Sequence, residues 1–115
     1  MNPYEMQEKS PEDFLKIVYI LIKKNIKLLI SIEDDKVRGK LSLPLLKIKF
    51  ETTSKTLEAL SLMIHYLQGE VGDSMADSYA TIGMHIGQGN IAENETDVSF
   101  HYQMALQILA NMAEA

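Results

Sequence analysis

The chain has 115 residues and a net charge of -5, with no cysteine and no tryptophan. A chain of this length can form one domain with its own core, because folding buries roughly two-thirds of the unfolded surface at this size. The absence of cysteine excludes disulfides, thiolate metal sites and a cysteine nucleophile.

The first predicted element is a short N-terminal arm, residues 1–9. Glu5 and Glu8 stand where a secretory signal peptide would carry basic residues, so no signal is predicted. The apolar run at 17–22 is too short to span a bilayer, and lysines interrupt the sequence after it. We therefore expect a cytoplasmic protein without membrane contact.

A long first helix is predicted over residues 11–32. Ser10 suits the capping position, Pro11 the first helical position, and Asp13 follows the serine at capping-box spacing. A strand over 17–22 is the alternative, because β-branched residues are frequent there, but the capping signal and the length of the pattern favour a helix. The charged segment 33–40 is predicted to be a loop. The apolar positions of the helix are Phe14, Leu15, Val18, Leu21, Ile22, Leu28, Leu29 and Ile32.

The second predicted helix covers residues 45–68 and has the strongest periodicity in the chain. Pro44 suits its first turn and Gly69 its C-terminal end, while the conformation of 41–50 stays open. The pattern predicts that this apolar stripe faces the core. Its members are Leu46, Phe50, Thr53, Leu57, Leu60, Ile64 and Leu67.

The third and fourth helices are predicted over residues 73–88 and 94–113. Glycines at 87 and 89 are expected to end the third helix, and Asn94 to cap the fourth. A stripe of small residues, Ala76, Ala80, Gly83 and Gly87, can bring a neighbouring helix of the bundle close or can form the floor of a groove for another chain. The predicted core stripes are Met75, Tyr79, Ile82 and Ile86, and then Val98, Tyr102, Ala105, Leu109 and Met112.

Four helices joined by short or medium loops predict an all-α, antiparallel up-down four-helix bundle with a short N-terminal arm. We expect a single domain over residues 1–115, because no connection is long enough to be a linker between domains.

Charge is distributed unevenly along this bundle. Residues 1–55 contain eleven basic and eight acidic side chains, a net charge of +3, and residues 56–115 contain eight acidic side chains and no basic one. The small excess on the first half, without interleaved aromatic residues, predicts no nucleic-acid binding. The charge-poor helices of the second half predict either a broad core face or a surface that a partner covers. The side chains in question are Met63, Tyr66, Met84, Phe100 and Met104.

The histidines predict no metal centre. His65, His85 and His101 lie on three different helices, and the nearest carboxylate at helical spacing is Asp97, four residues before His101. No phosphate-binding loop follows a strand, and no motif surrounds a serine nucleophile. We expect no enzymatic activity and no cofactor; a weak metal-binding bundle that uses the histidines is the enzyme alternative.

Two segments resemble the flagellar export chaperone FliS family. The chain begins Met1-Asn2-Pro3-Tyr4, and Ser10-Pro11-Glu12 opens the first helix, with Tyr19 eight residues after Pro11. Residues 67–72 are Leu-Gln-Gly-Glu-Val-Gly, followed by Met75-Ala76 and Tyr79, which resembles the junction between the family's second and third helices. The order and lengths of the predicted helices agree with that family as well.

The resemblance implies a cytoplasmic chaperone that binds the disordered C-terminal segment of flagellin, prevents its early polymerisation and presents it to the export gate. It also implies partner-binding roles for Tyr4, Tyr19 and Tyr79, while Ile20 replaces an aspartate that the family usually has. We expect a monomer or a weak homodimer, and a self-associating helical adaptor is the alternative. The predicted partner-binding residues are Tyr4, Tyr19, Ile20, Met63, Tyr66, Met75, Tyr79, Met84 and Met104.

Overall fold

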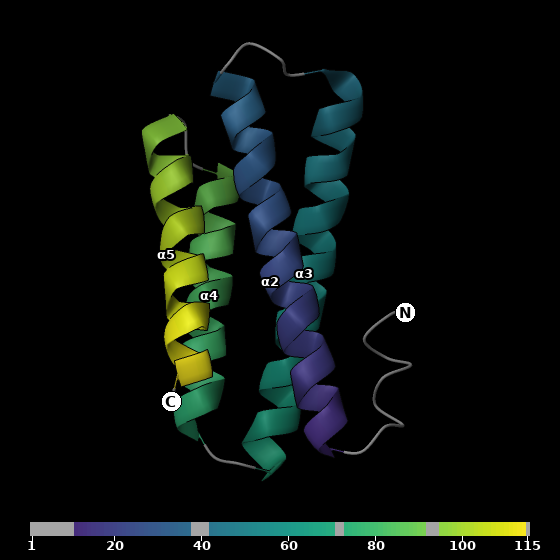
Figure 1. The fold of residues 1–115 in the computed structure, drawn as a ribbon, viewed down its shortest axis with the longest axis vertical. Coiled ribbons are helices and arrows are strands. Elements are labelled where there is room, and N and C mark those ends of the chain that lie inside the picture. The colour runs from purple at the N-terminus through teal and green to yellow at the C-terminus, as the bar shows by residue number, and fades with distance from the viewer. Residues whose placement is uncertain (1–10, 38–41, 71–72, 92–94, 115) are drawn as a thin grey trace.

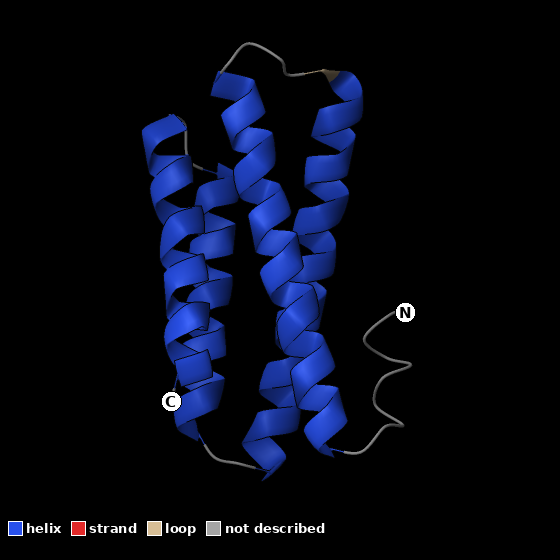
Figure 2. Cartoon of the chain, in the orientation of Figure 1, coloured by secondary structure: helices blue, strands red, loops and turns tan. Residues whose placement is uncertain are grey.

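The computed structural model describes residues 11–37, 42–70, 73–91 and 95–114, which form four helices. These are α2 (Pro11–Val37), α3 (Leu43–Glu70), α4 (Asp73–Ile91) and α5 (Glu95–Glu114). Successive helices run in opposite directions, and α2 packs against both α3 and α5, while α4 packs against α3 and α5 (Figure 1). No strand occurs among the described residues (Figure 2). The prediction of an all-α antiparallel bundle is confirmed, and the predicted arm, residues 1–9, lies outside the described residues.

The first helix is longer than predicted. It continues through the charged segment to Val37, so the prediction of a loop over 33–37 is wrong. The reason is a tertiary contact: Glu33 is buried, and its Oε1 accepts a hydrogen bond from Nζ of Lys49 on α3. A charge that is paired across two helices can continue a buried helical face, whereas an isolated charge could not.

Ser42 caps the start of α3. Its carbonyl oxygen accepts a hydrogen bond from the Leu46 amide at 3.0 Å, and its Oγ accepts one from the Leu45 amide at 3.4 Å. Pro44 lies in the first turn, where its missing N–H costs nothing. Most of the segment over 41–50, which the sequence pattern left open, is therefore helical from Leu43 onward.

The glycines of α4 do not end the helix, contrary to the prediction. The helix runs through Gly87 and Gly89 to Ile91. Gly89 is buried, and a Cβ placed on it would lie only 2.6 Å from Cε1 of Tyr102 on α5. Glycine is needed at this position because the ring of Tyr102 packs directly on the α4 backbone.

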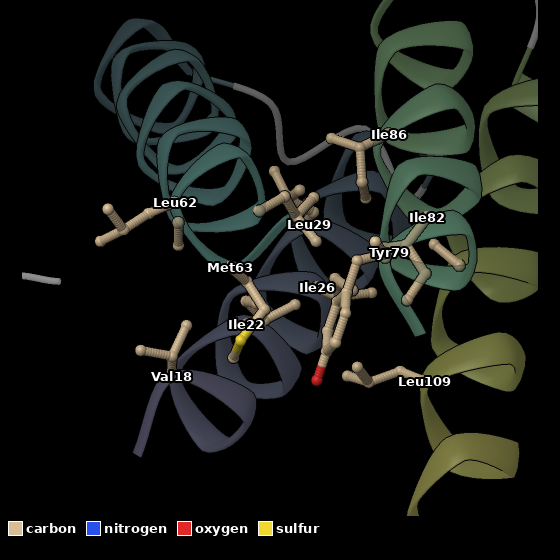
Figure 3. Packing of buried hydrophobic residues seen from close by; sticks show 14 of the residues in the cluster. Val18, Ile22, Ile26, Leu29, Leu62, Met63, Tyr79, Ile82, Ile86 and Leu109 are labelled. Atoms are coloured by element: carbon tan, nitrogen blue, oxygen red, sulfur yellow. The ribbon is translucent and has the colours of Figure 1, made fainter. Parts of the chain in front are cut away.

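The core is a continuous cluster to which all four helices contribute. The α4 and α5 stripes are largely as predicted, except that Met75 is partly exposed and Met112 partly buried. Figure 3 shows Met63 and Tyr79 directed inward from opposite sides of this cluster. The largest fully buried side chains are Phe14, Val18, Ile22, Ile26, Leu29, Leu60, Met63, Leu67, Ile82, Ile86, Tyr102 and Leu109.

The two helical hairpins differ in length. Helices α2 and α3 have 27 and 28 residues, and α4 and α5 have 19 and 20. Eight extra residues correspond to roughly 12 Å of helix. In Figure 1 the end of the bundle that contains the C-terminus of α2 and the N-terminus of α3 projects beyond α4 and α5. The first turns of α3 therefore have α2 beside them but not the second hairpin.

Candidate functional site

The most extended exposed apolar feature among the described residues is on α3. Leu43 is 82% exposed, Leu46 44%, Phe50 71% and Leu57 38%. The spacings of three, four and seven residues place all four on one side of the helix. We call these four residues the α3 stripe. It extends over about 21 Å, which matches roughly four turns of a partner helix.

The α3 stripe corrects the predicted core face of this helix. Of the predicted series, Thr53, Leu60 and Leu67 are buried, but Leu46, Phe50 and Leu57 face outward. The buried face of α3 is instead rotated toward small and polar residues. Its additional members are Thr52, Thr56, Ala59, Leu62 and Met63.

Threonines can fill this part of the core because their hydroxyl groups find local partners. The Oγ1 of Thr56 donates a hydrogen bond to the Thr52 carbonyl oxygen at 2.7 Å, within α3 itself. Such a bond makes the buried hydroxyl tolerable without a partner on another helix. In this half of α3 the threonines occupy the core, and Leu46, Phe50 and Leu57 are left on the outside.

The α3 stripe borders the contact between α3 and α4. Leu60, one turn beyond Leu57, is buried, and its Cδ1 lies 3.8 Å from the position that a Cβ on Gly83 would take. This is an ordinary van der Waals distance, so a side chain as small as alanine would also fit at Gly83. At Gly87, one turn further, the same Cβ position has no atom within 4 Å. The glycines at 83 and 87 are therefore not required by close packing, in contrast to Gly89.

The exterior of α4 and α5 is poor in charge. Among their described side chains, Asp77 and Asp97 are the acidic ones, and no basic residue is present. Single apolar side chains stand out on each helix: Met84 is 54% exposed and Phe100 is 55% exposed. The outward residues of α5 are neutral, as predicted: Ser99, Gln103, Gln107 and Asn111.

Two of the predicted partner-binding residues belong to the core. Met63 is fully buried and Tyr79 is 3% exposed, so neither side chain is offered on the surface. Burial raises the pKa of Tyr79 to about 12, and the nearby Tyr19 adds to the shift. The prediction of a partner-binding role for Met63 is wrong, because Met63 lies one turn from Leu60 and Leu67 on the buried face of α3.

Three predicted residues lie half-buried at contacts between helices. Tyr19 donates a hydrogen bond from its hydroxyl group to the Leu109 carbonyl oxygen at 3.0 Å and so ties α2 to α5. The ring of Tyr66 packs on Phe14 of α2, with 4.6 Å between centroids. Met104 is partly covered on α5. Tyr19 and Tyr66 therefore connect helices of the bundle.

The remaining predicted residues are on the surface or outside the described part. Ile20 is 54% exposed on α2, and Met75 and Met84 are exposed on α4. They lie on different helices from the α3 stripe. Tyr4 falls outside the described residues, so its predicted role is not addressed by the structure.

A buried polar cluster lies at the base of the projecting hairpin. It consists of Glu33 on α2, Lys49 and Thr53 on α3, and Tyr102 on α5. Nζ of Lys49 lies 6.0 Å from the centroid of the Tyr102 ring. Burial, and after it the charge of Glu33, raises the pKa of Tyr102 to about 12, although the nearby Thr53 hydroxyl group lowers it. Oε2 of Glu33, Oγ1 of Thr53 and the hydroxyl oxygen of Tyr102 are buried without a clear hydrogen-bond partner.

This cluster is not predicted from the sequence, although the spacing of Glu33 indicates it. Glu33 follows Leu29 by four residues and so continues the buried row of α2. It was assigned to a loop because its neighbours are charged.

Two histidines meet between α4 and α5. Nδ1 of His85 and Nδ1 of His101 are 3.0 Å apart, and both side chains are half-buried. Burial, and after it the charge of His101, lowers the pKa of His85. The sequence pointed to Asp97 as a neighbour of His101; the contact that the structure adds is His85, on the adjacent helix.

None of the described helices combines the length and the hydropathy required to cross a bilayer. Comparison of the chain with protein-family models, with curated proteins and with solved structures finds no match.

Proposed function

We propose that this protein is a helix-binding chaperone that holds an amphipathic segment of another protein against the α3 stripe. The observation that carries the proposal is the uncovered row of Leu43, Leu46, Phe50 and Leu57. A row of apolar side chains at three- and four-residue spacing is the surface that an amphipathic helix recognises. Burying these side chains against a partner removes apolar surface from water, at about 25 cal/mol per Å².

Charged side chains of both signs lie beside the α3 stripe. Lys47, Glu51, Lys55 and Glu58 are exposed on the same helix and alternate in sign along it. Charges at the rim of an apolar contact contribute to register and association rate more than to affinity. These four charges lie on one side of the α3 stripe, so the partner we expect is apolar along one face and carries charges of both signs beside it.

The resemblance to the FliS family suggests the partner. By that resemblance the segment is the disordered C-terminal part of flagellin, which would be held in the cytoplasm before export and presented to the export gate. A disordered segment that folds on binding fits a long, narrow apolar row better than a compact partner would.

Titration with a flagellin C-terminal segment tests this proposal. We expect a 1:1 complex by native mass spectrometry, a Kd in or below the micromolar range, and a gain of helical circular dichroism beyond the sum of the two components. The absence of binding at tens of micromolar would rule out flagellin as the partner. Sedimentation of the protein alone provides the control: a stable dimer would favour the self-associating adaptor instead.

A further inference from the structure

We propose that His85 and His101 form a binding site for one divalent transition-metal ion, with Cu²⁺ preferred. The two rings come from adjacent helices, α4 and α5, and their Nδ1 atoms are 3.0 Å apart. This inference is independent of the proposed chaperone function.

Without metal, the 3.0 Å separation is that of an N–H···N hydrogen bond, in which one ring donates and the other accepts. The same separation suits a shared metal ion, which binds once both rings carry their proton on Nε2. Imidazole nitrogens bind first-row metals at about 2.0–2.1 Å. Two such nitrogens at a right angle are about 2.9 Å apart, and at a tetrahedral angle about 3.4 Å apart. The observed 3.0 Å lies close to the right-angle value, which is typical of the square-planar or tetragonal geometry of Cu²⁺.

The surroundings keep the two rings in place and leave room for solvent ligands. The rings are tilted by 36° with centroids 5.2 Å apart, and Phe100 packs edge-on against His101 at 5.3 Å. Both side chains are half-buried, so one side of the pair faces water. Among the described residues no third histidine or carboxylate converges on the pair. Water would complete the coordination, and the affinity is expected to be modest.

Cu²⁺ is the probe of choice because it binds nitrogen ligands more tightly than the other divalent first-row ions. We expect substoichiometric Cu²⁺ to broaden the imidazole proton resonances of His85 and His101 in NMR spectra near neutral pH, while His65 is broadened only at higher concentration. His65 serves as an internal control because it is exposed on α3. Broadening of His65 first, or no broadening at equimolar Cu²⁺, would overturn the proposal.

Single variants assign the ligands. His85→Ala and His101→Ala should each weaken Cu²⁺ binding about ten-fold or more, and His65→Ala should leave it unchanged. Cu²⁺ should also raise the melting temperature of the wild type and of His65→Ala, because it binds only the folded pair. Unchanged Cu²⁺ affinity in His85→Ala would overturn the proposal. If that variant unfolds, the order in which Cu²⁺ broadens the histidine resonances of the wild type still tests the proposal.

Discussion

Lys49 on α3 donates a hydrogen bond through Nζ to Oε1 of Glu33 on α2, and the resulting ion pair is almost enclosed. The Glu33 side chain is 4% exposed and that of Lys49 15%. The ring of Tyr102 on α5 lies beside the pair. The salt bridge thus marks the level at which the four-helix core gives way to the projecting α2–α3 hairpin.

Removing one member of this pair should destabilise the fold strongly. Glu33→Leu leaves the ammonium of Lys49 without its partner, and Lys49→Met leaves a buried carboxylate unpaired. Each should lower the free energy of unfolding by about 3 kcal/mol or more in urea titrations. The double variant should recover most of that loss, since apolar residues of similar size often replace a buried ion pair without cost.

Lys55→Met, at an exposed position of α3, is the matched control. Strictly additive losses would contradict a direct interaction.

Removing the hydroxyl group of Tyr19 should lower the stability of the protein, whereas removing that of Tyr102 should not. Tyr19→Phe removes the hydrogen bond to the Leu109 carbonyl oxygen and should cost about 1 kcal/mol. Tyr102→Phe removes a buried hydroxyl group that lacks a clear partner, so stability should stay the same or rise. Chemical denaturation of both variants gives the comparison. A loss for Tyr102→Phe as large as that for Tyr19→Phe would mean that the Tyr102 hydroxyl group is well bonded.

Alkaline pH should unfold the protein through its buried tyrosines. The pKa values of Tyr79 and Tyr102 are raised to about 12 from an ordinary value near 10. The unfolded chain therefore loses these protons first, so their contribution is complete below pH 10 and stability falls as pH rises from about 10 to about 12. Phenolate absorbance should show these two of the five tyrosines ionising late or together with unfolding. In Tyr79→Phe, one tyrosine fewer should ionise at the high end of the titration. Five tyrosines that titrate near pH 10 in the folded protein would contradict the burial.

Replacing Met63 or Met84 with glutamate should have very different effects on stability, because one side chain is buried and the other is exposed. Met63→Glu places a carboxylate at a fully buried position and should destabilise the protein by more than about 4 kcal/mol. Met84→Glu alters a side chain that is 54% exposed and should change stability by less than about 0.5 kcal/mol. Thermal unfolding followed by circular dichroism measures both. Equal destabilisation would place Met84 in the core.

Much of the fold can be predicted from the sequence because helical periodicity and capping are local signals. The stripes of α4 and α5 were predicted residue by residue apart from their ends, and Pro44 marked the first turn of α3. The helix ends were less predictable where tertiary contacts decide them. Glu33 lies on the buried face of α2, where Lys49 from another helix pairs with its charge.

The candidate site was less predictable because periodicity identifies a face but not what covers it. The regular row of Leu46, Phe50 and Leu57 gives the same apolar pattern whether it faces the core or the solvent. The row faces outward because α3 is rotated so that Thr52, Thr53 and Thr56 are buried instead. The contact of His85 with His101 likewise depends on the register of α4 against α5, which neither helix specifies alone.

The measurement that tests the central claim most directly compares Phe50→Ser with Phe100→Ser in titrations with the flagellin C-terminal segment. The two phenylalanines are both more than half exposed, at 71% and 55%, but only Phe50 belongs to the α3 stripe. Phe50→Ser should raise the Kd about ten-fold or more, equivalent to roughly 1.4 kcal/mol. Phe100→Ser should change the Kd less than about two-fold, and both variants should keep the wild-type melting temperature. Unchanged binding in Phe50→Ser, or an equal loss in Phe100→Ser, would contradict the assignment of the α3 stripe as the binding surface.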